Sequence, residues 1–324
     1  LRTELYQLNY SGQDAQADNI LDNEQILDEY DLYPSANLIY ALTDDSNLRG
    51  SFSRTTARPS FKEASIAQIF DPVTNRTFIG NAFGLVDDAG QVIFDPIKPT
   101  YINNFDIRYE FFGDKGQMYA ISGFYKDFKD PIETTFFPQT AEQFTVANLG
   151  NANVFGIEVE ARQNLGFITN GLEKMKLNIN ASYINSELTM SDSEYDRRVN
   201  AARVGETVDR KRDLQGQSPY LINIGLDYSN NEKGIQTGLY YNVQGEALEV
   251  VGTGVIPDVY TQPFHSLNFT LSKKLGENKN SSLDFKVTNI LGDDRESLYN
   301  AFQASDLIYS LRTPGTEISL GYSY

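Results

Sequence analysis

The most densely charged stretch of the chain runs from Ser191 to Gly216 and is the first place to look for a binding site. Acidic and basic side chains are interspersed along it: Arg197, Arg198, Arg203, Arg210, Lys211 and Arg212 among Asp192, Glu194, Asp196, Glu206, Asp209 and Asp213. The guanidinium groups could contact an anionic ligand, because they pair with carboxylate and phosphate groups. Mixed charges are also typical of a solvated loop, which is the more common case. The candidates for ligand contact are Arg197, Arg198, Arg210 and Arg212.

Two adjacent aromatic residues, Phe136 and Phe137, form a second candidate site. They precede Pro138 in a stretch whose pattern indicates a loop, although residues 143–149 could form a strand. Such a pair could cover a ligand, or it could pack the loop against the rest of the protein. Packing is the more common role, and both interpretations stay open.

Residues that could support catalysis or hold a metal ion are scarce. His265 is the single histidine, and the chain has no cysteine. A Ser-His-Asp site would have to use His265 beside Ser266, but no G-x-S-x-G sequence is present. A metal site would depend on carboxylates, and the stretch from Asp87 to Gly90 lacks the D-x-D-x-D-G spacing of a calcium loop. We therefore predict no catalytic, cofactor-binding or metal-binding residue and no enzyme.

The elements that must position these side chains are strands. The last stretch, from Thr316 to Tyr324, alternates strictly, with Ile318, Leu320, Tyr322 and Tyr324 on one face and small or polar residues on the other. A period of two is the signature of a strand with one apolar face. The same alternation returns in about 12 segments, so the predicted fold class is all-β.

Short and long connections alternate without exception between these strands. Short turns are predicted at residues 43–47, 113–116, 166–173, 229–234 and 276–280. The long connections include the acidic segment from 11 to about 32, an irregular one ending near Lys98, and the polar segment 186–218, none of which reads as a strand. Outer-membrane barrels have short periplasmic turns and longer extracellular loops. The sequence thus predicts a transmembrane antiparallel outer-membrane β-barrel whose C-terminus is periplasmic.

In such a barrel the apolar stripe faces lipid and the polar stripe faces the lumen. The predicted lumen-facing charges lie on two strands and are Arg108, Glu110, Glu158, Glu160 and Arg162. On the lipid face at the midplane, an arginine or lysine would cost about 2–4 kcal/mol. Each charge alone is most simply explained by solvation or by a paired network.

Composition excludes other classes of protein. The net charge of -17 argues against nucleic acid as a partner, because that binding needs clustered lysine and arginine. Mean hydropathy is -0.41, and no run approaches the ~18 apolar residues of a spanning helix. No signal peptide precedes Leu1, so we expect the chain to be a piece of something longer.

Several phrases, in order along the chain, resemble TonB-dependent outer-membrane receptors, in a style similar to those of the Bacteroidota. They include L-R-G-S-F-S-R-T-T-A-R-P-S-F-K-E (48–63), K-P-T-Y-I-N-N-F-D-I-R-Y-E (98–110), F-Y-K-D-F-K-D-P-I-E (124–133), N-L-G-N-A-N-V-F-G-I-E-V-E (148–160), L-Q-G-Q-S-P-Y-L-I-N (214–223) and F-K-V-T-N-I-L-G-D (285–293). The resemblance covers nearly the whole chain.

The resemblance implies a 22-stranded barrel filled by an N-terminal plug domain. Residues 1–324 would be its C-terminal half, about the last 12 strands, with the earlier strands and the plug absent. The implied function is energy-coupled uptake of a scarce nutrient such as a siderophore, haem, cobalamin, glycan or peptide. The implied partners are the plug and the N-terminal strands, the periplasmic TonB system, outer-membrane lipid with lipopolysaccharide, and a surface lipoprotein.

Two alternatives stay open. One is a self-contained 12-stranded outer-membrane channel or hydrolase, because an even number of strands can close into a barrel. The other is a structural barrel in an envelope complex. The ligand itself is out of reach of the sequence, since one scaffold serves many ligands.

Overall fold

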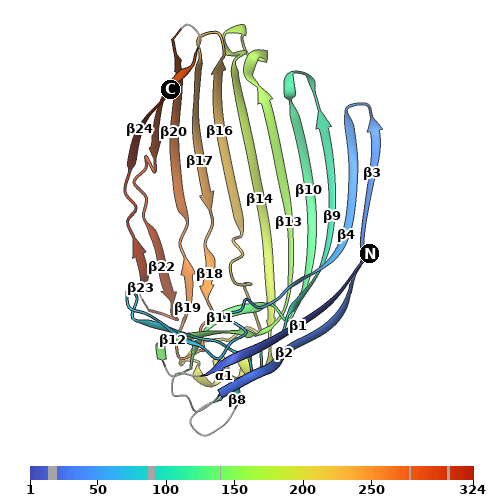
Figure 1. Cartoon of the computed structure of the whole chain (residues 1–324), viewed down its shortest axis with the longest axis vertical. Helices are drawn as coiled ribbons and strands as arrows, with labels where there is room; N and C mark the ends of the chain where they lie inside the picture. Colours follow the sequence, from blue (N-terminus) through green and yellow to red (C-terminus); the bar gives the residue numbers. More distant parts are fainter. Residues whose placement is uncertain (14–19, 87–91, 139, 277–278, 305–306) are drawn as a thin grey trace.

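The computed structural model describes residues 1–13, 20–86, 92–138, 140–276, 279–304 and 307–324. Its main feature is a long, curved antiparallel sheet with the strand order β24-β21-β20-β17-β16-β14-β13-β10-β9-β4-β3 (Figure 1). These strands are β3 (Ser35–Thr43), β4 (Ser46–Ala57), β9 (Thr100–Phe112), β10 (Met118–Lys129), β13 (Gly150–Asn164), β14 (Met175–Met190), β16 (Tyr220–Asn230), β17 (Ile235–Gln244), β20 (Phe264–Leu275), β21 (Ser281–Thr288) and β24 (Glu317–Ser323). The predicted all-β antiparallel fold is confirmed.

The two faces of this sheet differ as the alternation requires. Ile107 and Ile157, which both pair with Gly123, are 57% and 54% exposed on one face. The next register position, Arg108–Ser122–Glu158, is polar and lies on the opposite face. A sheet with a bare apolar face and a polar face is built for lipid on one side and a polar interior on the other.

The predicted short turns at 43–47, 113–116, 166–173 and 229–234 lie at one end of the sheet, where β20 also ends and β21 begins, and the long connections lie at the other end (Figure 1). Residues 277–278 of the fifth predicted turn, 276–280, lie outside the described residues. We call the two ends of the sheet the short-turn end and the loop end. The C-terminal strand β24 finishes at the short-turn end (Figure 1). Segregation of connections by length is confirmed, and it is the pattern of an outer-membrane barrel.

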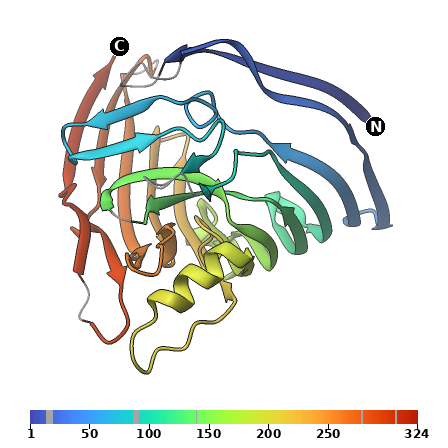
Figure 2. The ribbon, with the colours of Figure 1, turned by 90° about the horizontal axis from the view of Figure 1, so that it is seen from below.

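The sheet does not close on itself within the described part of the chain. Its edges are β3 and β24, which pair only with β4 and β21, and from the loop end the sheet is an open arc (Figure 2). The first predicted strand is β1 (Arg2–Gln13), which pairs with β2 (Ile20–Tyr33) in a separate hairpin. The open edges differ from the closed 12-stranded barrel that we considered as an alternative.

Strand β2 corrects one expectation, because residues 11 to about 32 were expected to form no strand. Its backbone pairs with β1 along the hairpin, and Leu27 and Tyr33 are buried. Acidic residues such as Asp22 and Glu24 lie exposed. A strand with one solvated face can carry charges on that face, so low apolar content did not exclude it.

Helix α1 (Asp192–Ala201) corrects a second expectation, since this segment was expected to be a loop. The N-cap is Ser191, whose hydroxyl accepts a hydrogen bond from the backbone N–H of Glu194 at 3.3 Å. Ser191 and Glu194 have the Ser-x-x-Glu spacing of a capping box, which marks a helix start. The described residues include no helix long and apolar enough to cross a membrane.

The long connections fold into small sheets at the loop end. One has the order β11-β12-β6-β5 and another β18-β19-β22-β23, while β15 pairs with β14. The strands are β5 (Gln68–Asp71), β6 (Arg76–Ile79), β7 (Leu85–Val86), β8 (Val92–Phe94), β11 (Ile132–Phe137), β12 (Thr140–Asn148), β15 (Lys211–Arg212), β18 (Ala247–Val250), β19 (Asp258–Thr261), β22 (Arg295–Asn300) and β23 (Leu307–Arg312). Short 3-10 helices occupy Asp114–Gly116, Leu165–Phe167 and Asn170–Leu172. Buried apolar clusters join the small sheets, as where Phe136 packs with Val250 and Val259.

Candidate functional site

Two predicted lumen-facing residues on β9 belong to a row of ion pairs on the polar face of the sheet. Arg108 donates to Glu110 Oε1 at 2.7 Å and to Glu160 Oε2, on β13, at 2.8 Å. Arg49 on β4 reaches the other oxygen of Glu110 at 2.6 Å. Side chains alternate between the two faces of a strand, and these four side chains lie on the same face. The ion pairs join residues of β4, β9 and β13, and the two positive charges balance the two negative ones.

The other predicted lumen-facing residues lie on the same face. Glu158 accepts a hydrogen bond from the Ser182 hydroxyl at 3.4 Å. Arg162 lines a shallow cavity of about 210 Å³ together with Glu160 and Asn180. The structure therefore brings all five residues to one wall. Contact of this wall with a plug stays a prediction.

At the loop end, five charged side chains from four elements form a buried cluster, which we call the charge network. Its members are Glu133 (β11), Glu194 and Arg198 (α1), Arg212 (β15) and Asp258 (β19). Arg212 donates to both oxygens of Glu133, at 2.9 and 2.7 Å, and its Nε donates to Glu194 Oε1 at 2.7 Å. Arg198 bridges Glu194, at 3.1 Å, and Asp258, at 2.7 and 2.9 Å.

These ion pairs are buried, and buried pairs contribute more to loop structure than exposed ones do. The side chains of Arg212, Glu133 and Glu194 are 5%, 1% and 2% exposed. Burial alone would lower the pKa of Arg212, but attraction and hydrogen bonds from Glu133 and Glu194 outweigh it and raise that pKa. Burial would raise the pKa of Asp258, but hydrogen bonds from Arg198 outweigh it and lower that pKa. The network therefore ties four loop elements together.

Among the predicted ligand-contact arginines, Arg198 and Arg212 thus have carboxylate partners inside the protein. Arg197 donates to the carbonyl of Ile93 at 3.3 Å and lies 5.3 Å over the Phe94 ring. Burial lowers the pKa of Arg197. Arg210 is the exposed member of the four; it pairs with Asp192 and lies 5.0 Å over Tyr195.

The aromatic candidates pack within the loops. Phe136 is fully buried, with its ring 6.4 Å from Tyr299 and 6.1 Å from Tyr309. Phe137 is partly buried and meets Phe94 edge to face at 6.2 Å. Their neighbours support the packing interpretation, and ligand contact by either ring stays a prediction.

The residues considered for catalysis and metal binding are not assembled into a site in the described part of the chain. His265 is exposed, and its Nδ1 lies 2.7 Å from the Tyr241 hydroxyl. No group of three or more His, Asp or Glu is gathered there for a metal ion. The Asp87–Gly90 stretch lies outside the described residues.

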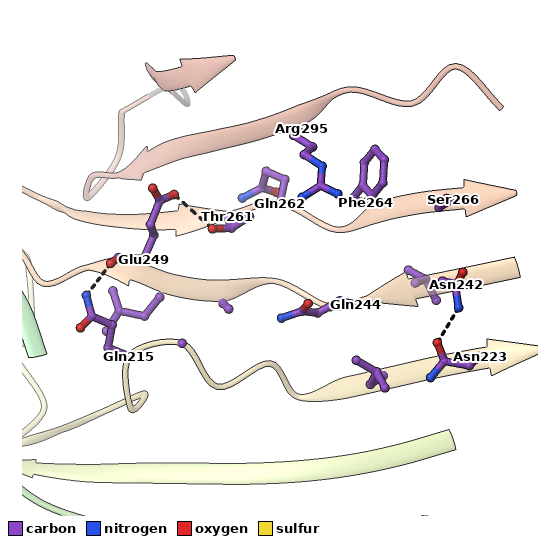
Figure 3. A pocket seen from close by; sticks show the side chains of 16 residues that line it. Gln215, Asn223, Asn242, Gln244, Glu249, Thr261, Gln262, Phe264, Ser266 and Arg295 are labelled. Carbon is purple, nitrogen blue, oxygen red and sulfur yellow. Dashed lines mark hydrogen bonds between the residues drawn. The ribbon is translucent and has the colours of Figure 1, made fainter. Parts of the chain in front are cut away.

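A larger pocket of about 570 Å³ lies on the polar face of β16, β17 and β20, where these strands meet the loop sheet (Figure 3). We call it the wall pocket. Most of its polar side chains are amides or hydroxyls, from Gln215, Asn223, Asn242, Gln244, Thr261, Gln262 and Ser266. Glu249 and Arg295 add one charge of each sign, and Leu221 and Phe264 add apolar surface.

The wall pocket lies at a break in the strand ladder. Pairing of β17 with β20 stops at Gln244–Phe264, and pairing of β18 with β19 begins at Ala247–Thr261. The intervening Pro263 has no N–H with which to continue the ladder. Gly245 leaves room for the Tyr220 ring, because an added Cβ would lie 2.8 Å from it. The strands therefore separate and expose side chains between them.

Several pocket side chains are held by hydrogen bonds. Asn242 donates to Asn223 at 2.6 Å, and Thr261 donates to Glu249 at 3.1 Å (Figure 3). Arg295 lies 4.5 Å over the ring of Phe264. The wall at Gln215 is joined to the charge network, because its backbone N–H donates to Glu133 Oε1 at 3.0 Å.

The sequence reasoning missed the wall pocket and the carboxylates of the charge network. Asn242 and Gln244 share one face of a predicted strand, and Asn223 pairs with Asn242 in the neighbouring strand. Amides recurring at a period of two on adjacent strands are a usable signal for a polar wall. Glu133 and Asp258 carry no comparable signal, because their partners are distant in the chain.

Comparisons with known proteins agree with this architecture. The family model described as TonB dependent receptor-like, beta-barrel matches residues 4–290. The ferric citrate transporter FecA in its unliganded form has a TM-score of 0.61 and 16% identity over 93% of this chain and 39% of its own. A search of curated protein sequences found no significant match.

Two further solved structures are similar. The ferric yersiniabactin uptake receptor FyuA from Yersinia pestis has a TM-score of 0.58 at 15% identity, and the FrpB iron transporter from Neisseria meningitidis has 0.56 at 14%. Each match covers 93% of this chain and 39% of the other. At such identities the likeness shows the fold alone. The chain thus spans about two fifths of the length of these structures.

Proposed function

Because the chain belongs to the TonB-dependent receptor-like β-barrel family, we propose that it forms the C-terminal part of a bacterial outer-membrane receptor that takes up a scarce nutrient. The observation that carries the proposal is the family match over residues 4–290 on a sheet with one exposed apolar face and one polar, ion-paired face. The three similar structures named above are a ferric citrate transporter, a ferric yersiniabactin uptake receptor and an iron transporter. Siderophore, haem, cobalamin, glycan and peptide remain the nutrient classes to be compared.

The open sheet edges support a larger barrel. β3 and β24 each carry an unpaired edge in the described part of the chain, and unpaired backbone groups in lipid cost several kcal/mol each. We propose that further strands of the same receptor pair with these edges, giving a 22-stranded barrel whose last half is residues 1–324. A plug domain would fill the lumen against the wall of Arg108, Glu110 and Glu160.

Energy coupling and orientation complete the proposal. The short-turn end would face the periplasm together with the C-terminus, because outer-membrane barrels keep their short turns on that side. The periplasmic TonB system would act on the plug. The loop end would face outward, toward lipopolysaccharide and a surface lipoprotein, with Arg210 as the exposed ligand-contact candidate.

Growth on single limiting nutrients tests this function. Cells that carry the complete receptor, cells that lack it and cells that lack the coupling protein are compared on iron-siderophore, haem, cobalamin, glycan or peptide as the limiting source. We expect receptor loss and coupling loss to abolish growth on the same nutrient. If the receptor is needed but coupling is not, a diffusion channel or embedded enzyme replaces the proposal. If neither loss affects growth on any source, a structural barrel replaces it.

A further inference from the structure

We propose that the wall pocket binds a neutral, hydroxyl-rich ligand, an oligosaccharide. The proposal rests on the receptor function proposed above and names the class of nutrient. Its basis is the chemistry of the pocket lining: five amides and two hydroxyls, with a single carboxylate and a single guanidinium.

The charge of the pocket favours a neutral ligand over an anionic one. Glu249 and Arg295 cancel in formal charge, and the guanidinium of Arg295 is already placed over the Phe264 ring. The whole chain carries a net charge of -17. An anionic metal chelate would have to leave water for a site without surplus positive charge, and burying an unpaired charge is costly.

Amide side chains match sugar hydroxyls in hydrogen-bonding capacity. Each carboxamide offers two donors and one acceptor oxygen, and each hydroxyl both donates and accepts. Gln244 donates to the Ser218 hydroxyl at 2.8 Å, and Gln262 donates to Glu246 at 3.2 Å and to the Tyr260 carbonyl at 3.5 Å. An amide also has an acceptor oxygen, so both side chains keep hydrogen-bonding capacity for a ligand. Asn223 and Asn242 form a bonded pair beside them. A pocket lined in this way can form hydrogen bonds both to the donor and to the acceptor of each neighbouring hydroxyl.

The apolar part of the pocket suits the other half of a sugar ring. Leu221 and Phe264 are partly exposed and both pair with Gln244, so they lie on the same face as the amides. Phe264 lies beside Arg295 in the pocket (Figure 3). A pyranose presents C–H groups as well as hydroxyls, so it needs a surface of both kinds. A volume of about 570 Å³ lies within the usual range for ligand pockets, ~300–1,000 Å³.

An extended peptide fits the wall pocket less well. Peptides are commonly held by adding a strand to an open sheet edge. The strands β16, β17 and β20 lie inside the sheet, with partners on both sides. A ligand in the pocket would therefore be recognised by side chains and not by strand addition. Hydrogen bonds from amide and hydroxyl side chains suit a hydroxyl-rich ligand.

The test uses the full-length receptor, purified from outer membranes in detergent. The receptor is applied to an array of neutral oligosaccharides, and its affinity for the best binder is measured by titration calorimetry. A ferric catecholate and a neutral peptide library serve as competing probes. The pocket variant is the double substitution Asn242→Ala with Gln244→Ala. Its matched control is Gln236→Ala, on the same strand and face but six and eight residues from the two substituted positions, toward the short-turn end.

We expect the array to yield a neutral oligosaccharide whose affinity falls about tenfold or more in the pocket variant, since each lost hydrogen bond typically costs a few-fold. Gln236→Ala should stay within about twofold. A second variant, Gln244→Glu, keeps the side-chain shape and adds a charge, and it should weaken binding similarly. Heat-modifiable migration on gels verifies that each variant is folded.

Three outcomes overturn the inference. They are no binding to any oligosaccharide on the array, binding only of the catecholate or of peptides, and oligosaccharide binding that the pocket variants leave unchanged. If growth still requires both receptor and coupling protein, the proposed receptor function survives any of these failures. If growth is independent of coupling, the proposed function fails whatever the array shows.

Discussion

Arg212 donates two hydrogen bonds to the two carboxylate oxygens of Glu133, at 2.9 and 2.7 Å, across 79 residues of sequence. Both side chains are almost completely buried, and the pair fastens β15 to β11 at the loop end. Glu194 shares Arg212, so one guanidinium serves two buried carboxylates. Removing charged groups from water is expensive, and only this complete set of partners compensates for it.

Replacing Arg212 should therefore loosen the loops more than any exposed ion pair would. We expect Arg212→Met in the full-length receptor to lower the free energy of local unfolding by about 3–5 kcal/mol, because it leaves Glu133 and Glu194 buried without that partner. Hydrogen exchange of backbone amides in β11 and α1 measures the change. Lys115→Met removes a pair with Glu173 whose side chains are 63% and 61% exposed, and it should change little, within about 1 kcal/mol. Equal effects of the two substitutions would contradict a structural role for the network.

Asp258 makes the loop end sensitive to acid. Burial alone would raise its pKa, but two hydrogen bonds from Arg198 and one from the backbone N–H of Gly252 outweigh it and lower the pKa. A carboxyl whose pKa is lower when folded stabilises the fold above its unfolded pKa of about 3.9, and loses that contribution as pH falls through the folded value. We expect β19 and α1 to stay protected from exchange from pH 7 to about pH 4 and to open at lower pH.

The matched variant Asp258→Asn separates this group from other acids. It should already be less stable at pH 7, since it loses the charge-assisted pair with Arg198, and its stability should fall less steeply below about pH 4. Exchange or limited proteolysis of residues 192–201 across this pH range provides the measurement. Parallel acid profiles for the variant and the parent would show that Asp258 is not the responsible group.

The two adjacent phenylalanines should differ in their effect on stability. Phe136 has no exposed surface, and its ring packs with Val250, Val259 and two tyrosines. We expect Phe136→Ala to cost about 3–5 kcal/mol of local stability, from lost burial and the cavity left behind. Phe137→Ala should cost less, because Phe137 is only partly buried. Limited proteolysis of the loop sheets compares the two variants. A Phe136→Ala variant as stable as the parent would contradict the packing role and favour the ligand-covering interpretation.

The spanning part of the fold was predictable because each strand there has two different environments. A strand with a lipid face and a polar face must alternate, as Ile157 and Glu158 do, so a period of two marks it in the sequence. Strand β2 is not part of the spanning sheet, so its sequence need not alternate in this way. Its many acidic residues therefore did not indicate a strand. The start of helix α1 has a capping-box signal, Ser191 and Glu194. The signal lies in a segment whose mixed charges indicated only a loop.

The candidate sites were less predictable, because they depend on contacts between distant segments. Arginine density drew attention to residues 191–216, but whether an arginine there is paired inside the protein depends on Glu133 and Asp258, which lie elsewhere in the chain. The wall pocket likewise depends on where two strand ladders separate near Pro263. Neither feature has a sequence period, so three-dimensional structure was needed to find them.

The orientation of the sheet in the membrane can be tested directly, since the chain contains no cysteine. Gly171→Cys places a thiol in a short turn where an added Cβ meets nothing within 4 Å, and Val204→Cys places one in a fully exposed position at the loop end. We expect a membrane-impermeant maleimide to label Val204→Cys on intact cells, and Gly171→Cys only after the outer membrane is permeabilised. This follows if the short turns are periplasmic. Labelling of Gly171→Cys alone on intact cells would reverse the orientation and place the C-terminal end of β24 outside.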